Sequence, residues 1–204
     1  MRQLFFLTLI LLTSQIAICQ VDQVYTVTAE TLNVRQGPGV EHPKVYTLRK
    51  GKEVIVVSDE SSPWYMIDLG FTQGYVSSKY LTKDPDWVKK SHGNGDVPDC
   101  ENILPRYDRS MDNFLRITVG SNTDVVVKLM KTGYSRDECI RLAYVRTNES
   151  FDIKNIPEGV YYLKLAYGKD WRQKVVAGKC TGKFLKNAAY EKGDERLDYN
   201  KQYT

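Results

Sequence analysis

Hydrophobic and polar residues alternate in short runs between residues 24 and 81, which is the pattern of short β-strands. The runs are separated by segments rich in Gly, Pro, Ser and Asp, residue types that favour turns. The predicted strands are residues 25–28, 32–35, 45–48, 54–57, 64–68 and 74–76. A lone sheet of such short strands would leave its edges and one apolar face bare, so we expect a small closed barrel.

A second set of runs begins at residue 113 and is rich in β-branched and aromatic residues. It predicts strands at residues 114–119, 125–130, 139–145, 150–153, 160–167 and 170–176. Residues 183–192 fit either a pair of strands or a short helix. The whole pattern predicts an all-β protein, with a barrel over residues 20–81 and a two-sheet β-sandwich over residues 113–204.

The segment between the two predicted domains, residues 82–112, is polar and rich in turn-forming residues. Its acidic residues lack the Asp-x-Asp-x-Asp-Gly spacing of a calcium-binding loop. We therefore expect a solvated polar linker, and we expect neither a metal site nor a cofactor in the chain.

The first nineteen residues have the composition of a secretory signal peptide. One positive charge precedes the apolar run Leu4–Leu12, which only Thr8 interrupts, and Ala17 and Cys19 place small residues before the expected cleavage at Gln20. So short an apolar run cannot span a bilayer, and no transmembrane segment is expected. The alternative is a lipoprotein acylated at Cys19. Either way we expect an exported protein of the periplasm, the cell envelope or the extracellular space.

Composition narrows the function further. With 42% hydrophobic residues and charges of both signs mixed along the chain, the protein is expected to fold. A net charge of +4 from 29 basic and 25 acidic residues is too small an excess to predict a nucleic-acid partner. The only histidines, His42 and His92, both precede the predicted sandwich. We therefore expect no catalytic residues and no enzyme activity, although a hydrolase based on paired carboxylates stays conceivable.

Three cysteines follow the predicted signal peptide, an odd number for an oxidising compartment. Cys139 and Cys180 both lie in the strand-rich C-terminal part, whereas Cys100 lies in the polar stretch. The predicted disulfide is therefore Cys139–Cys180. Cys100 is then left either as a free thiol or as a link between two subunits.

Four separate pieces of the first region, in order and at matching spacing, resemble a bacterial SH3 domain. They are Thr28–Pro38 (TAETLNVRQGP), Leu48–Gly51 (LRKG), Trp64-Tyr65 and Gly74–Leu81 (GYVSSKYL). The resemblance covers residues 24–81. It implies an SH3-like barrel in an exported envelope protein, where such domains commonly bind peptides or tether a neighbouring domain to peptidoglycan.

The predicted barrel carries aromatic residues near its loops, and these are the candidates for ligand contact. The predicted ligand-binding set is Tyr25, Tyr46, Tyr65, Phe71 and Tyr75. Tyr80 is similarly placed and Trp64 stands beside Tyr65. Alternation along a strand sends Trp64 and Tyr65 to opposite faces but does not say which of them is buried.

The run Ser150–Leu163 resembles the strand-turn-strand signature of transthyretin-like and collagen-adhesin B-type sandwiches, which implies an accessory or spacer domain. We therefore predict an exported, non-enzymatic binding module whose barrel binds peptidoglycan or a peptide and whose sandwich is an accessory or interaction domain. The alternative is a structural or assembly protein of the envelope that contacts another envelope protein through both domains.

Overall fold

The structure, a computed structural model, describes residues 22–101 and 103–200. The predicted signal peptide and Cys19 lie outside the described residues. Described residues outside the loops are almost entirely in strands, which confirms the predicted all-β class; one 3₁₀ turn, η1 (Ser78–Tyr80), is present. Within the described residues, no helix is long and apolar enough to cross a membrane.

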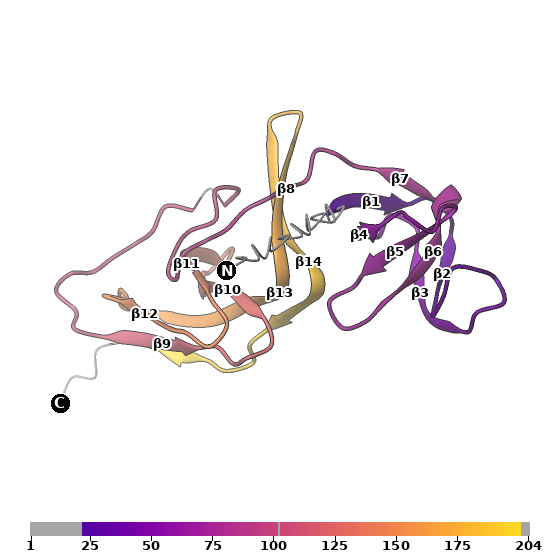
Figure 1. Ribbon diagram of the computed structural model, residues 1–204. Coiled ribbons are helices and arrows are strands. Elements are labelled where there is room, and N and C mark those ends of the chain that lie inside the picture. Colours follow the sequence, from indigo (N-terminus) through magenta and orange to yellow (C-terminus); the bar gives the residue numbers. More distant parts are fainter. Residues whose placement is uncertain (1–21, 102, 201–204) are drawn as a thin grey trace, which may run out of the picture.

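The N-terminal region forms one seven-stranded antiparallel sheet that curls into a barrel (Figure 1). The strand order is β3-β2-β6-β5-β4-β1-β7. The strands are β1 (Gln23–Val27), β2 (Thr31–Arg35), β3 (Lys44–Arg49), β4 (Glu53–Ser58), β5 (Trp64–Asp68), β6 (Gln73–Ser77) and β7 (Leu81–Lys83).

Alternating apolar residues of the barrel strands form its core. Leu32 and Val34 of β2 are 4% and 0% exposed, as the alternation predicts. Gly74 lies inside β6, against β2. A Cβ at Gly74 would lie 2.6 Å from Val34 Cγ1 and 2.7 Å from the carbonyl oxygen of Arg35. Glycine is required here because the two strands approach closely.

The C-terminal region contains a six-stranded sheet and a two-stranded sheet. The larger sheet runs β11-β10-β13-β14, with β8 and β15 also paired to β13, and the smaller one pairs β12 with β9. The strands are β8 (Val88–Lys89), β9 (Phe114–Thr118), β10 (Asp124–Lys131), β11 (Glu138–Val145), β12 (Ser150–Lys154), β13 (Val160–Val176), β14 (Lys179–Lys192) and β15 (Leu197–Asp198). The β13–β14 hairpin of the larger sheet lies between the barrel and the two-stranded sheet of β9 and β12 (Figure 1).

Both faces of the larger sheet are covered, because β10 buries alternate residues on opposite sides. Val125, Val127 and Leu129 belong to a core that also packs residues of the two-stranded sheet. Val126 belongs to the opposite cluster, with Trp171 among others.

The structure differs from the expectation of a solvated linker at residues 82–112. Trp87 and His92 are 6% and 9% exposed, and Val88 and Lys89 form β8 against β13. Asp96 accepts a backbone hydrogen bond from Tyr144. This segment is therefore a covering layer of the larger sheet. The domain boundaries themselves stay a prediction.

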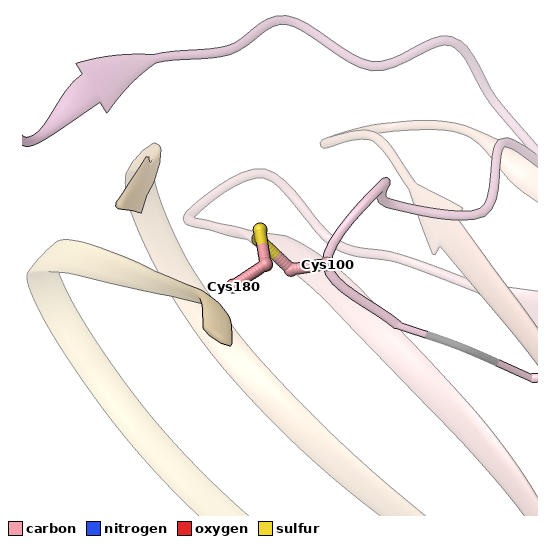
Figure 2. Close-up of a disulfide and its surroundings, with 2 residues drawn as sticks. All are labelled: Cys100 and Cys180. Atoms are coloured by element: carbon pink, nitrogen blue, oxygen red, sulfur yellow. A yellow bond between two sulfur atoms is a disulfide. The ribbon is translucent and has the colours of Figure 1, made fainter. Parts of the chain in front are cut away.

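The predicted Cys139–Cys180 disulfide is wrong: Cys180 pairs with Cys100, with a Cα–Cα distance of 4.9 Å (Figure 2). Cys139 is a free thiol in β11, whereas Cys180 is in β14. Strands β10 and β13 lie between them, and at about 4.8 Å per strand this separation exceeds the span of a disulfide. The covering segment instead brings Cys100 to the hairpin.

Candidate ligand groove on the barrel

Four of the five predicted rings pack as two edge-to-face pairs. Tyr46 and Phe71 pack edge to face with their centroids 5.3 Å apart, and Tyr25 and Tyr65 do the same at 5.8 Å. Tyr75 of β6 is half-buried and lies opposite Met66 of β5. Ligand contact by these rings stays a prediction.

The two tyrosine–aromatic pairs differ in exposure. Tyr46 and Phe71 are 44% and 59% exposed. Tyr25 and Tyr65 are partly buried and pack against the barrel core, and burial raises the pKa of Tyr25. Most of the apolar surface of Tyr25 and Tyr65 is therefore buried against the barrel core and is not available to a ligand.

A groove of about 500 Å³ crosses a different part of the barrel surface. Its lining combines two aromatic rings, Trp64 and Tyr80, with small, polar and basic residues. The remaining lining residues are Ala29, Thr31, Leu32, Asn33, Arg35, Val40, Ser77 and Lys79.

Strand alternation and one tight turn place these side chains. Because Leu32 and Val34 point into the core, Thr31, Asn33 and Arg35 of β2 point outward. Trp64 of β5 lies directly opposite Ser77 of β6, so the two side chains are neighbours in the groove.

The 3₁₀ turn η1 follows Ser77 directly and carries Lys79 and Tyr80 to the groove. The N–H of Leu81 donates to the carbonyl of Ser78, which closes the turn. Tyr80 is 37% exposed and its ring lies 5.0 Å from Lys79 Nζ.

The groove is electropositive. Arg35 and Lys79 contribute two cations, and none of the described residues that line it is acidic. The Arg35 guanidinium donates a hydrogen bond of 2.7 Å to the carbonyl oxygen of His42, which fixes the side chain along the groove. Although the barrel segment is neutral overall, this surface can attract a carboxylate.

Trp64 and Tyr80 line the groove but do not belong to the predicted ligand-binding set. Alternation had placed Trp64 and Tyr65 on opposite faces, and the structure shows which is which: Tyr65 packs against the core and Trp64 faces the groove. The motif Gly74–Leu81 contained the missing signal, since its last residues form the turn that presents Tyr80.

Residues 30–82 match the family model of the bacterial SH3 domain. This part of the chain is a bacterial SH3 domain, and it contains most of the groove-lining residues.

Related sequences cover the same part of the chain. The probable endopeptidase p60 of Listeria innocua is 39% identical over 71 residues, which is 31% of this chain and 15% of that protein. The probable endopeptidase p60 of Listeria seeligeri is 44% identical over 57 residues, which is 28% of this chain and 11% of that protein. The chain thus spans only a small part of the length of these relatives.

Two solved structures of Trichomonas vaginalis proteins were also found. NlpC2 is 11% identical with a TM-score of 0.29, covering 79% of this chain and 48% of that one. NlpC1 is 11% identical with the same TM-score, covering 91% of this chain and 51% of that one. Likeness at this level carries no argument about fold or function.

Proposed function

We propose that this protein is an exported, non-catalytic binding protein of the cell envelope, whose barrel groove binds the peptide part of peptidoglycan. The observation that carries the proposal is the electropositive groove between Trp64 and Tyr80 on a bacterial SH3 domain. Rigid aromatic rings suit an extended peptide, because they bury apolar area at little cost in conformational entropy.

The charges of the groove favour a ligand with a carboxylate. The peptide stems of peptidoglycan carry carboxylates along the stem and at its end, whereas its glycan backbone is largely uncharged. Arg35 supplies a planar guanidinium that can pair with both oxygens of a carboxylate, and Lys79 supplies a second cation. A neutral sugar chain would use neither.

The Cys100–Cys180 disulfide bears on both the export and the alternative function. A disulfide is typical of an oxidising compartment, which supports an exported or envelope location. The alternative, an assembly protein whose subunits are linked through Cys100, loses its main argument because Cys100 is paired within its own chain. In the proposed function, the sandwich region serves as an accessory or interaction domain.

Retention on purified peptidoglycan sacculi tests the proposal. Trp64→Ala is expected to lose retention, whereas Tyr46→Ala, which removes an exposed ring outside the groove, is expected to keep it. Lys79→Glu should also lose retention, with Lys52→Glu as the control of equal charge change, since both lysines are exposed. Retention of all four variants at the level of the unmodified protein would contradict the groove as the binding site.

A further inference from the structure

Three lysines stand in a row across three neighbouring strands of the larger sheet. Lys128 of β10 lies directly opposite Lys164 of β13, and Lys164 lies directly opposite Lys192 of β14. With strands about 4.8 Å apart, the row places three cations over about 10 Å.

Such a row costs stability, because like charges directly opposite each other in a sheet repel. Only Lys128 is neutralised, by the carboxylate of Glu101, both of whose oxygens lie 2.8 Å from its Nζ. Lys164 and Lys192 have no ion-pair partner within 4 Å among residues 22–101 and 103–200. Both lie instead over the ring of Tyr162, with Nζ at 5.9 and 4.6 Å from its centroid.

Asp137 is a carboxylate near this pair, and its oxygens accept hydrogen bonds from other groups. It accepts a hydrogen bond of 2.8 Å from the Tyr162 hydroxyl and another from the N–H of Gly133. These hydrogen bonds, and more weakly Lys192 and Lys164, lower the pKa of Asp137. Asp137 therefore attracts the two lysines only weakly, and it forms no direct ion pair with either of them among the described residues.

The row borders a groove of about 380 Å³ on the same face of the sheet. Val126 and Ala166 supply apolar surface, and Trp171 and Tyr190 supply aromatic surface, with Tyr190 68% exposed. Leu165 also borders the groove, but its side chain packs into the core on the other face of the sheet. The other residues that line the groove are polar or charged, apart from one glycine: Glu101, Lys128, Lys164, Gly182, Lys183, Glu191 and Lys192.

The groove suits an anionic sugar better than a peptide. A peptide could add a strand only at the edge of β14, beside the groove, because β10 and β13 beneath it are paired on both sides. Glu191 accepts a hydrogen bond from the Tyr167 hydroxyl and is engaged there. Glu101, which is paired with Lys128, would repel a continuous phosphate chain but can accept hydrogen bonds from sugar hydroxyls. Tyr190 offers a face on which a sugar ring can stack.

We propose that this groove is a second binding site, which takes a carboxylated glycan with its carboxylates on Lys164 and Lys192 and a sugar ring against Tyr190. In this proposal, the repulsion between the lysines lowers the stability of the fold but gives the site its charge. The proposal is independent of the barrel groove, because the two sites share no lining residue.

Calorimetric titration of the full chain with hexagalacturonate at low salt tests the site. The double variant Lys164→Gln/Lys192→Gln should bind at least about tenfold more weakly, since each lysine makes a charge-assisted contact. Lys44→Gln/Lys52→Gln removes two exposed lysines of the barrel and should bind as the unmodified protein does. Trp64→Ala should also bind normally, which separates this site from the proposed function.

Thermal unfolding of the same double variant gives a second readout. Because the substitutions relieve repulsion within the row, the variant should unfold at the same or a higher temperature than the unmodified protein. Loss of binding with retained stability would show that the lysine row serves binding and does not stabilise the fold. A lower unfolding temperature would contradict the argument from repulsion.

Control ligands test whether the site prefers a carboxylated glycan. Neutral chitohexaose, hexaglutamate and hexametaphosphate should each bind much more weakly than hexagalacturonate. Equal binding of the neutral sugar, the acidic peptide or the phosphate chain would overturn the assignment to a carboxylated glycan, as would equal loss of binding in both double-lysine variants.

Discussion

Lys186 of β14 and Asp68 of β5 form an ion pair of 2.8 Å that joins the C-terminal hairpin to the barrel. One residue further along, the N–H of Asn187 donates to the carbonyl of Leu69 at 2.9 Å. The side chains of Lys186 and Asp68 are only 17% and 20% exposed, so this contact is part of a packed junction.

The junction has an apolar centre beside these polar contacts. Residues of the barrel, the covering segment and β14 form one buried cluster. Its members are Val24, Ile55, Val57, Trp87 and Leu185, with Met66 packed against them. A second ion pair of 2.7 Å links Lys183 to Glu53. A small hydrophobic core, separate from the core inside the barrel, therefore holds the barrel against the hairpin.

The junction predicts an acid-sensitive contribution to stability. Burial by itself would raise the pKa of Asp68, but hydrogen bonds from Lys186 and from the N–H of Gly70, together with the Lys186 charge, outweigh it and lower the pKa. A carboxyl with a lowered pKa in the folded state stabilises the fold above its unfolded-state pKa of about 3.9, and this contribution is lost as the pH falls further.

The free energy of unfolding should therefore fall less steeply below about pH 4 in Asp68→Asn than in the unmodified protein. Denaturant titrations at several pH values measure this slope. Asp112→Asn removes an exposed carboxylate outside the junction and is the control. Identical slopes for Asp68→Asn and the unmodified protein would contradict the ion pair.

Truncation at the centre of the junction should destabilise the protein. Leu185 is 4% exposed, and Leu185→Ala is expected to lower the free energy of unfolding by about 2 to 4 kcal/mol. Val176→Ala, at an exposed position of β13 in the same hairpin, should change it by less than about 0.5 kcal/mol. Equal effects of the two substitutions would argue against a packed junction.

The cysteine pairing predicts a simple labelling pattern. Among Cys100, Cys139 and Cys180, only Cys139 should react with an alkylating agent in the unfolded, non-reduced chain, and all three should react after reduction. Mass spectrometry of proteolytic fragments reads this directly. Labelling of Cys100 without reduction would be incompatible with the observed disulfide.

The disulfide should also contribute substantially to stability. Its two cysteines are 80 residues apart, and on the chain-entropy model closing such a loop stabilises the fold by about 4 to 5 kcal/mol. Cys100→Ser should lose a large part of this stabilisation in denaturant titrations. Cys139→Ser should lose far less, because Cys139 closes no loop.

Close packing at Gly74 predicts a strong effect of one methyl group. Gly74→Ala places its Cβ against Val34 and the backbone of Arg35 and should destabilise the barrel by about 1 to 3 kcal/mol. Gly120→Ala meets open space and should be nearly neutral in the same denaturant titration. A neutral Gly74→Ala would mean that β2 and β6 can separate without cost.

The parts of the fold that could be predicted are those that local alternation determines. Leu32 and Val34 define an inward face within five residues, so the barrel strands and their orientation follow from β2 and its neighbours. Gly168 is different. The sequence pattern predicts a strand that ends just before Gly168, yet β13 continues through this residue. The strand has a bulge between Tyr167 and Lys169, because Gly168 packs tightly against Phe184 of β14.

The features that could not be predicted depend on partners distant in sequence. The segment around Trp87 has the composition of a linker, but the contacts that bury Trp87 come from the barrel and from Leu185, about a hundred residues away. Predicting the cysteine pairing would have required the strand order, which separates β11 from β14. The aromatic groove required knowing which of two adjacent rings, Trp64 or Tyr65, faces the core.

In the proposed function, the SH3 domain binds its ligand between Trp64 and Tyr80. The most direct measurement is a nuclear magnetic resonance titration of the full chain with a soluble muropeptide that carries a complete peptide stem. We expect the largest shift changes on the Trp64 indole and on the amides of Arg35, Lys79 and Tyr80. Shift changes centred on Tyr46 and Phe71, or on no part of the barrel, would contradict the proposed function.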